Sequence, residues 1–491
     1  MKKNFLLLFL LIFTLAACTN GSQPLFMIPT EDSEISSAED SVLDTPYPTR
    51  PAYEPGELVD YIAQTGDTLP GLAVRFNTTV EEIRAANPII PSDATTMPPG
   101  MPMSIPIYYR ALWGTPYQII PDAVYVNGPD ASAFNIAQFI NQQGGWLYKY
   151  DAWAFSGTRT AAEIVDYVAN NYSVSPKLLL ALLEYQAGVF SNLSISNDTE
   201  AKIMGLDSPY WVGVYLQMAH AADILNDGYY RWREGDLIEF ELADGSIIRP
   251  DPWQNAATVA LQYFFAQVLD ADQYQSAIGQ DGFAATYQRL FGDPWSMEAH
   301  IPGSLTQPEL SLPYINDASW AFTGGPHTGW GSLFPWTALD FAPPSDQTGC
   351  YISSVATTAV GSGVVVRDGE GFLVLDLDGD GDEHTGWNIF YLHMANEGRV
   401  PVGTVVEAGD YLGYPSCEGG RSTGTHIHVA RKYNGEWISA SGVIPFVLSG
   451  WRPLAGDAAY SGYLVKDDVY IVANSKPDNR SAIPVDGVEE Q

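Results

Sequence analysis

The feature that most constrains the fold is a change in hydrophobic periodicity near Ser304. Between about residues 110 and 300, apolar residues recur at helical spacing, whereas beyond Ser304 short apolar runs alternate with Gly and Asp turns, as in strands. A chain of 491 residues is also too long for one ordinary hydrophobic core, so two to four domains are expected. The predicted fold class is therefore multidomain, with a mainly α middle region and an all-β, antiparallel C-terminal region.

The N-terminus has the pattern of an export signal. Lys2 and Lys3 precede an apolar run from Phe5 to Leu15 that is too short to span a membrane as a stable helix. Leu-Ala-Ala-Cys, ending at Cys18, resembles the lipobox at which bacterial lipoproteins are cleaved and acylated. We expect residues 1–18 to be a lipoprotein signal and the protein to be extracytoplasmic, lipid-anchored to the cell membrane through Cys18. The alternative is a plain signal peptide with an incidental cysteine.

The net charge excludes one class of partner. With a formal charge of −35, the chain lacks the basic surface that nucleic-acid binding needs. A neutral or cationic glycan or peptide remains compatible with this charge. Residues 19–58 are rich in Ser, Thr, Pro, Asp and Glu, without periodic apolar residues, and are expected to form a disordered tether.

The next segment predicts a small α+β module of βααβ order. A helix opens at Asp67 or Thr68, Thr79 and Glu82 form a capping box for a second helix, and MSIPIYY supplies a closing strand. The fragments GDTL, LAVRF, IRAANP and PPGMPMSIP resemble a LysM module. That resemblance implies binding to glycans that contain N-acetylglucosamine, such as peptidoglycan; a purely structural module is the alternative.

One acidic residue stands out in the helical region. Glu184 follows the apolar run LLLALL in a helix that begins with Pro176. This position is similar to the helix end that carries the catalytic glutamate of lytic transglycosylases and other lysozyme-like folds, where a carboxylic acid protonates the glycosidic oxygen. Those families usually have Ser-Gly after the glutamate, whereas Tyr-Gln-Ala-Gly follows here. A helix-end glutamate without activity is the interpretation that we prefer.

A pair of histidines near the C-terminus suggests a metal site. The chain has seven histidines, and five of them lie between His327 and His428. Residues two apart in a strand share a face and lie about 6.6 Å apart, so His426 and His428 would present two imidazoles side by side. A catalytic zinc needs three His, Asp or Glu ligands and one open position. The helical HExxH motif is absent, and the candidates are therefore His327, Asp340, His393, His426 and His428.

The fragments around these residues resemble a known family. GGPHTGW, ALDFAPP, IFYLHM and GTHIHVA occur in the order found in lysostaphin-type peptidoglycan endopeptidases, also called LytM or beta-lytic metallopeptidases, over about residues 320–440. His327 and Asp340 are thirteen positions apart, a spacing similar to that of the beta-lytic branch. The resemblance implies an antiparallel β-sandwich of the duplicated hybrid motif type. It also implies Zn²⁺ held by His327, Asp340 and His428, with His393 and His426 as the catalytic pair.

Two cysteines remain beyond Cys18. A disulfide between Cys350 and Cys417 is our hypothesis, since an exported compartment permits one; two separate buried thiols are the alternative. In the family resembled, the equivalent of Cys417 is bonded to a cysteine in a strand that carries none here, so Cys350 would be a substitute.

An acidic run lies between two of the predicted strands. Asp376, Asp378, Asp380 and the following glycine resemble a calcium loop, but the acid expected at the twelfth position is replaced by Trp387. We expect a solvated acidic hairpin tip, with calcium binding as the alternative.

Together these observations predict a lipid-anchored, zinc-dependent peptidoglycan endopeptidase that LysM directs to glycan. The alternative is a non-catalytic wall-binding scaffold or an activator of other hydrolases. The expected domains are a signal peptide (1–18), a linker (19–58), a LysM domain (59–109), a helical and possibly lysozyme-like domain (110–300), a zinc peptidase domain (301–456) and a C-terminal tail that frays (457–491).

Overall fold

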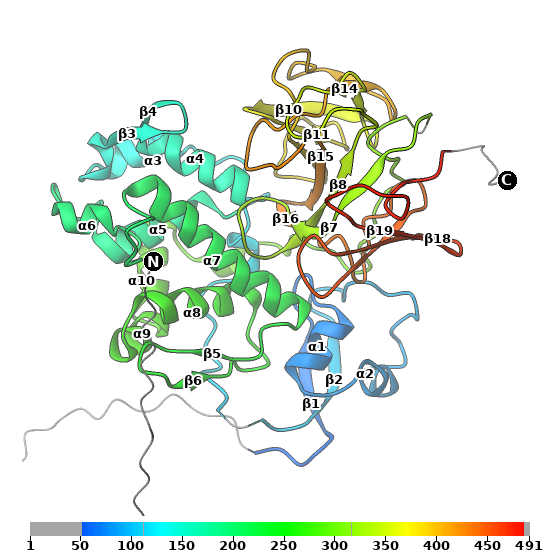
Figure 1. The fold of residues 1–491 in the computed structure, drawn as a ribbon. Coiled ribbons are helices and arrows are strands. Elements are labelled where there is room, and N and C mark those ends of the chain that lie inside the picture. The colour runs from blue at the N-terminus through cyan, green and yellow to red at the C-terminus, as the bar shows by residue number, and fades with distance from the viewer. Residues whose placement is uncertain (1–51, 111, 316, 486–491) are drawn as a thin grey trace, which may run out of the picture. The chain divides into compact units, whose positions relative to one another are not determined.

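The computed structural model describes residues 52–110, 112–315 and 317–485 (Figure 1). The expected signal peptide, Cys18 and most of the expected linker lie outside this part of the chain. Among the described residues, no helix has the length and apolar character needed to cross a membrane.

The first folded segment has the predicted βααβ order. It comprises β1 (Glu57–Ile62), α1 (Leu69–Arg75), α2 (Val80–Ala86) and β2 (Pro102–Ile107), and the two strands pair antiparallel. Thr68 caps α1 by accepting a hydrogen bond from the backbone N–H of Gly71. Thr79 and Glu82 form the capping box of α2, which confirms that local prediction.

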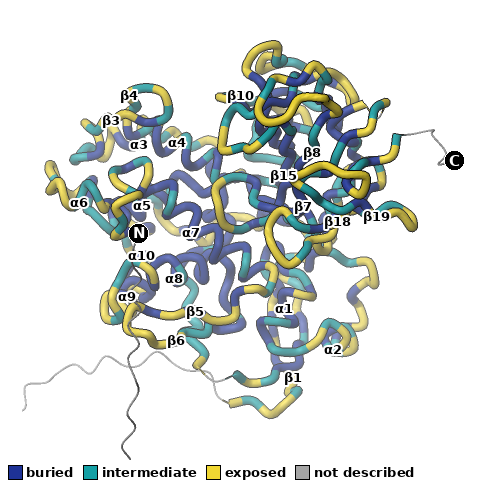
Figure 2. The backbone as a smooth tube through the Cα atoms, viewed as in Figure 1, coloured by how far each residue is buried: buried dark blue, intermediate teal, exposed yellow. Residues whose placement is uncertain are grey.

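The middle region is helical, as predicted. Its helices are α3 (Ile136–Gln143), α4 (Ala161–Tyr172), α5 (Pro176–Ala187), α6 (Asn197–Ala201), α7 (Val214–Glu234), α8 (Ala256–Val268), α9 (Ala271–Ile278) and α10 (Phe283–Phe291). Short 3₁₀ turns occur at Asp122–Val124, Leu147–Lys149 and Pro294–Ser296, and two hairpins, β3–β4 (Asp151–Ala154, Gly157–Thr160) and β5–β6 (Phe240–Glu241, Ile247–Ile248), interrupt the helices. Among these helices, α5, α7 and α8 carry most of the buried residues (Figure 2). Helices α7 and α8 approach closely because Gly228 has no side chain; a Cβ there would lie 3.0 Å from the Ala260 Cα.

The C-terminal region is built on one large antiparallel sheet. Its strand order is β13-β10-β11-β12-β15-β8-β7, with β16 paired to β15. The strands are β7 (Ala321–Thr328), β8 (Trp336–Ala342), β10 (Gly363–Gly369), β11 (Phe372–Asp376), β12 (Trp387–Leu392), β13 (Val405–Val406), β15 (Ile427–Tyr433) and β16 (Glu436–Trp437). A two-stranded sheet is formed by β9 (Thr357–Thr358) and β14 (Tyr411–Gly413).

The two faces of the large sheet belong to different cores. Leu339 and Val429 lie in the core of the C-terminal region itself. Ala338 and Ala430, one position away on the same strands, lie in the core that includes the middle helices. Side chains alternate between faces along a strand, so Asp340 and His428 share the second face with Ala338 and Ala430. The middle region therefore packs on the face that carries these two candidate ligands.

The segment after residue 456 does not fray as we expected. Strands β17 (Arg452–Ala455), β18 (Gly462–Lys466) and β19 (Val469–Val472) form a three-stranded antiparallel sheet. Leu464, Ile471 and Ile483 are 1%, 5% and 0% exposed, respectively. The expectation of a fraying tail was wrong because the alternating pattern YLVKDDVYIV forms a hairpin whose alternate residues are buried in the sheet domain.

Candidate metal centre

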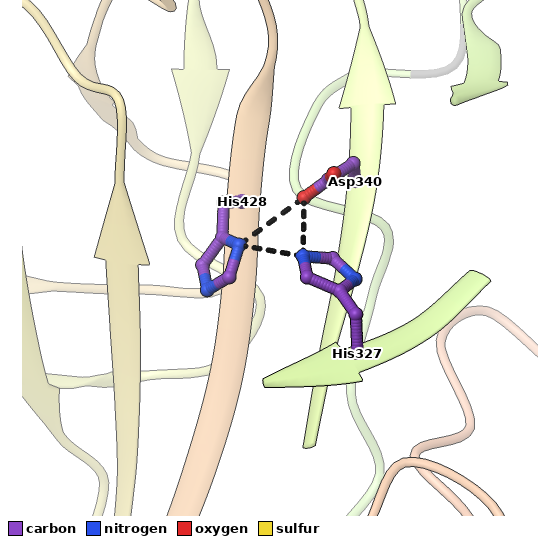
Figure 3. A group of neighbouring side chains, drawn as sticks. All are labelled: His327, Asp340 and His428. Atoms are coloured by element: carbon purple, nitrogen blue, oxygen red, sulfur yellow. Dashed lines mark hydrogen bonds and ion pairs between the residues drawn. The ribbon is translucent and has the colours of Figure 1, made fainter. Parts of the chain in front are cut away.

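Three candidate ligands meet on neighbouring strands (Figure 3). His327 lies in β7, Asp340 in β8 and His428 in β15. The Nε2 of His327 is 3.0 Å from the Nδ1 of His428, and each of these nitrogens is 3.2 Å from the Oδ1 of Asp340. The three residues are 1–5% exposed.

The strand register brings these residues together. Asp340 and His428 are direct partners across the β8–β15 pair, which places their Cβ atoms about 5 Å apart on one face. His327 pairs with Ala338 in a β7–β8 ladder whose register shifts on either side of it. These irregularities redirect the end of β7, a known use of bulges near functional sites.

The hydrogen bonds of the two imidazoles define which nitrogens carry protons. The Nδ1 of His327 lies 2.8 Å from the Gly325 carbonyl oxygen, and the Nε2 of His428 lies 3.1 Å from that of Gly329. A carbonyl can only accept, so each neutral ring carries its proton on that nitrogen and presents a bare lone pair to Asp340.

Three acceptors therefore converge without a proton to share. The buried Oδ1 of Asp340 has no hydrogen-bond donor among the residues that the structure describes. Such an arrangement is repulsive unless a cation lies at its centre. Zinc–ligand distances of 2.0–2.2 Å correspond to tetrahedral ligand–ligand distances of about 3.3–3.6 Å, close to the spacing found here. The donor set thus fits a metal ion, and two imidazoles with one carboxylate suit zinc.

The local electrostatics keep the ligands in their binding forms. Burial opposes the negative charge of Asp340, but His327 and His426 outweigh it and hold the pKa of Asp340 well below its usual range. Burial lowers the pKa of His428 despite the adjacent carboxylate. The site therefore presents a carboxylate and a neutral imidazole at neutral pH.

Two further histidines border the three ligands. The Nδ1 of His426 lies 2.8 Å from the Gly424 carbonyl oxygen, and its Nε2 is 3.6 Å from the Asp340 Oδ2. The Nδ1 of His393 lies 2.9 Å from the Glu418 carbonyl oxygen. The rings of His393 and His426 have centroids 4.6 Å apart. Both rings donate Nδ1–H to a carbonyl, so both keep Nε2 as a proton acceptor.

His393 is held in an unusual state. Its φ angle of 62° lies in the left-handed region, which non-glycine residues rarely adopt outside functional or tightly constrained positions. Burial, with added repulsion from His426 and His428, lowers the pKa of His393 to about 3. The imidazole is therefore neutral throughout the physiological range.

A disulfide braces the loop that precedes His426. Cys350 is bonded to Cys417. Next to this bridge, Thr425 donates its backbone N–H to the Gly349 carbonyl (3.0 Å), and its hydroxyl accepts from the Tyr351 N–H (2.9 Å). The cross-link and these bonds fix the backbone that leads into His426.

Sequence reasoning missed one aromatic neighbour of the site. The ring of Tyr460 stacks on His327, with centroids 4.0 Å apart and planes 23° from parallel. The Gly325 N–H donates to the Tyr460 carbonyl (2.9 Å), which ties the loop after β17 to the end of β7. Tyr460 falls in the segment that we expected to fray, and no local motif marks it.

Glu184 is not part of this constellation. Its Oε2 accepts from the backbone N–H groups of Phe190 (2.8 Å) and Ser191 (3.3 Å), and its Oε1 accepts from the Ser191 hydroxyl and from Arg289 (3.0 Å). The side chain is 3% exposed. Both oxygens are thus engaged by donors, which favours the structural interpretation over that of a general acid.

Comparisons with known proteins agree with the geometry. A family model described as the LysM domain matches residues 61–106, and one described as the LasA N-terminal domain matches residues 118–304. Beta-lytic metalloendopeptidase of Lysobacter enzymogenes is 31% identical over 160 residues, which cover 31% of this chain and 82% of that protein. The chain belongs to the beta-lytic metalloendopeptidase family. It is accordingly an enzyme of the metallopeptidase class.

Other relatives of this family are similar over different lengths. Protease LasA of Pseudomonas aeruginosa (strain UCBPP-PA14) is 26% identical over 340 residues, 65% of this chain and 75% of LasA. The solved structure of the deep-sea M23 metalloprotease pseudoalterin is 24% identical in sequence, with a TM-score of 0.29. The aligned part covers 34% of this chain and 96% of the pseudoalterin chain. The middle region is similar to the LasA N-terminal domain over residues 118–304, and a lysozyme-like character of residues 110–300 stays a prediction.

Proposed function

We propose that this chain is a zinc-dependent endopeptidase that hydrolyses the cross-link peptides of peptidoglycan, with His327, Asp340 and His428 as the metal ligands. The observation that carries this proposal is the convergence of two bare imidazole nitrogens and one carboxylate oxygen at 3.0–3.2 Å. The family of beta-lytic metalloendopeptidases supports the reaction class, and the LysM match supports a cell-wall substrate.

The residues around the ligands suit peptide hydrolysis. A bound zinc ion would polarise the scissile carbonyl and lower the pKa of a water molecule towards about 7. His426, with its Nδ1–H on the Gly424 carbonyl, offers Nε2 as the general base that takes a proton from the attacking water. The His426 imidazolium formed in this way can return the proton to the leaving amine, and His393, whose ring centroid lies 4.6 Å from that of His426, is placed to contact the tetrahedral intermediate.

The parts outside the site have supporting roles in this proposal. The LysM domain (59–109) holds glycan strands, and the C-terminal region (301–456) has the duplicated hybrid motif of lysostaphin-type enzymes. The N-terminal sequence supports a lipid anchor at Cys18, which would keep the enzyme at the cell envelope and favour the cell's own wall as substrate.

The test separates metal binding from turnover. His428→Ala is expected to lose both bound zinc and wall-lytic activity, because it removes a ligand. His426→Ala is expected to retain about one zinc per chain and to lose activity by roughly 10²–10⁴-fold, the range for a general base. Zinc content is measured by elemental analysis, and cleavage by sequencing the new amino termini in digested peptidoglycan.

A matched control is His220→Ala, which removes a histidine that stacks on Trp211 in the middle region and lies outside the metal centre. It should leave zinc and activity unchanged. Purified wild-type protein that binds no zinc after metal loading would refute the proposal and leave the wall-binding scaffold as the better interpretation.

A further inference from the structure

A second cluster of carboxylates lies away from the zinc ligands, in the loop that joins β11 to β12. Asp376 ends β11, and Asp378 and Asp380 follow at alternate positions. One carboxylate oxygen from each residue lies within 4.8 Å of the others. Asp376 is 0% exposed, whereas Asp378 and Asp380 lie at the surface.

The negative charge of these three residues has no counter-ion among the residues that the structure describes. The neighbouring cations are already paired with other acids: Arg367 with Glu383, and His384 with Asp382. Within the described part of the chain, no ion pair includes Asp376, Asp378 or Asp380. Only Asp376 is buried, and its carboxylate accepts the backbone N–H groups of Asp378 (3.2 Å) and Gly381 (2.9 Å). These bonds do not neutralise its charge beside two further carboxylates, whereas a cation would.

An independent feature beneath the loop points to the same cation. Asn388 is the direct cross-strand partner of Asp376 and is 1% exposed. Its Nδ2 donates to the Thr385 carbonyl at the far end of the loop (2.7 Å), and the Thr385 hydroxyl donates to the Asp380 Oδ2 (2.8 Å). Asn388 therefore shares a sheet face with Asp376 and is linked through Thr385 to Asp380.

The oxygen of that amide is unsatisfied. The Oδ1 of Asn388 is buried and has no hydrogen-bond donor among the described residues. A buried amide oxygen without a partner requires an explanation, and a bound ion is one of the few available. Asp378 also packs against Gly386, two residues before Asn388, at a point where any side chain would collide with its carboxylate.

We propose that this loop binds one Ca²⁺ ion through the carboxylates of Asp376, Asp378 and Asp380 and the Oδ1 of Asn388. The donors are all oxygen, which suits a hard cation, and calcium accepts six to eight such ligands in flexible geometry. Asn388, next to the Trp387 that occupies the twelfth position, supplies an oxygen in place of the missing acid. The site thereby differs from the solvated hairpin tip that we expected from the sequence.

Calcium at this loop would also order a contact with the middle region. The Ser132 hydroxyl donates to Asp382 within the loop. Arg367, paired with Glu383 of the loop, donates to the Oδ1 of Asn171 in α4 (3.0 Å). A loop fixed by the ion would hold Asp382 and Glu383 in place for both contacts.

The site is tested on the full chain, stripped of metals and reloaded with one equivalent of zinc. Tb³⁺ is titrated with excitation of tryptophan, because Trp387 adjoins the ligand Asn388 and can sensitise the lanthanide. Emission should saturate at one Tb³⁺ per chain and be displaced by Ca²⁺ with a dissociation constant of about 10⁻⁴–10⁻³ M, the range of extracellular calcium modules. Calcium, but not an equal concentration of magnesium, should raise the melting temperature.

The double substitution Asp378→Asn with Asp380→Asn removes two exposed ligands at nearly constant side-chain volume. It should raise the Ca²⁺ dissociation constant, measured by displacement of Tb³⁺, at least tenfold. It should also abolish the calcium-dependent rise in melting temperature. The matched control is Asp467→Asn with Asp468→Asn, which removes the same charge from the exposed β18–β19 turn and should behave as wild type. The proposal is overturned by absence of sensitised emission, by an equal response to magnesium, or by equal losses in both double variants. Zinc content and peptidase activity do not enter the readout, so the outcome is independent of the proposed function.

Discussion

Replacement of Glu184 by glutamine distinguishes a structural from a catalytic carboxylate in the middle region. The substitution puts an NH₂ group in place of one carboxylate oxygen. That oxygen is either Oε1, which accepts from the Ser191 hydroxyl and Arg289, or Oε2, which accepts from the N–H groups of Phe190 and Ser191. Either orientation sets an NH₂ group against N–H donors that the carboxylate accepts from: Arg289 in one case, Phe190 and Ser191 in the other. Hydrogen bonds to charged groups contribute about 1.5–3 kcal/mol each. Arg289 is 54% exposed, so its ion pair adds little.

The expected loss is therefore about 2–4 kcal/mol in the free energy of unfolding, which lowers the melting temperature of a region of this size by roughly 5–15 °C. Thermal unfolding followed by circular dichroism measures the stability, and mass spectrometry of released muropeptides measures glycan cleavage. Peptide hydrolysis at 25 °C should be unchanged. Glu298→Gln, an exposed glutamate in the same region, should change neither quantity.

The catalytic interpretation makes the opposite prediction. Wild-type digests would contain anhydro or new reducing sugar ends, and Glu184→Gln would remove them while the melting temperature stayed within about 1 °C of wild type. That pair of results would refute the structural role assigned to Glu184.

Two further predictions concern stability. Because the pKa of His393 is lowered to about 3, the folded metal-free protein binds fewer protons than the unfolded chain between about pH 6.5 and 3. The free energy of unfolding therefore falls as the pH falls through this window, by at most about 1.4 kcal/mol per pH unit for this residue. Asn tolerates the left-handed backbone, so His393→Asn should flatten the pH dependence measured by urea unfolding between pH 4.5 and 7; an unchanged slope would contradict the assignment. Replacing both Cys350 and Cys417 by Ser opens a cross-link between residues 67 apart and should lower the free energy of unfolding by about 4 kcal/mol. Urea unfolding measures this loss, with reduced wild-type protein as the comparison. Equal stability of the oxidised wild type and the variant would argue against a stabilising disulfide.

The sequence predicted most of the local structure correctly because the signals are themselves local. The capping box of Thr79 and Glu82 acts within one turn of helix, and Pro176 begins α5 as expected for a first-turn proline. The switch to strand periodicity after Ser304 corresponds to the large antiparallel sheet. The hairpin of β18 and β19 was missed because its apolar alternation was outweighed by the polar composition of the surrounding tail.

The sequence predicted which residues form the candidate site, because their fragments occur in the same order as in the family that they resemble. It did not predict how their atoms are arranged. Alternation along one strand put His426 and His428 on the same side, but it could not show which ring nitrogen faces the metal position. That choice depends on the carbonyls of Gly325 and Gly329, which accept the opposite N–H of each imidazole. Tyr460 carried no motif, and its stacking on His327 comes from a loop more than a hundred residues away in the chain.

The sequence alone thus determined the order of helical and strand regions, the helix caps and the chemical types of the candidate ligands, since each depends on neighbours a few residues apart. Only the tertiary structure decided that two bare imidazole nitrogens and one carboxylate oxygen converge within 3.0–3.2 Å, and that an unsatisfied amide oxygen lies beneath an acidic loop. The physical reason is strand register. Asp340 opposes His428, and Asp376 opposes Asn388, only through pairings that no short stretch of sequence contains.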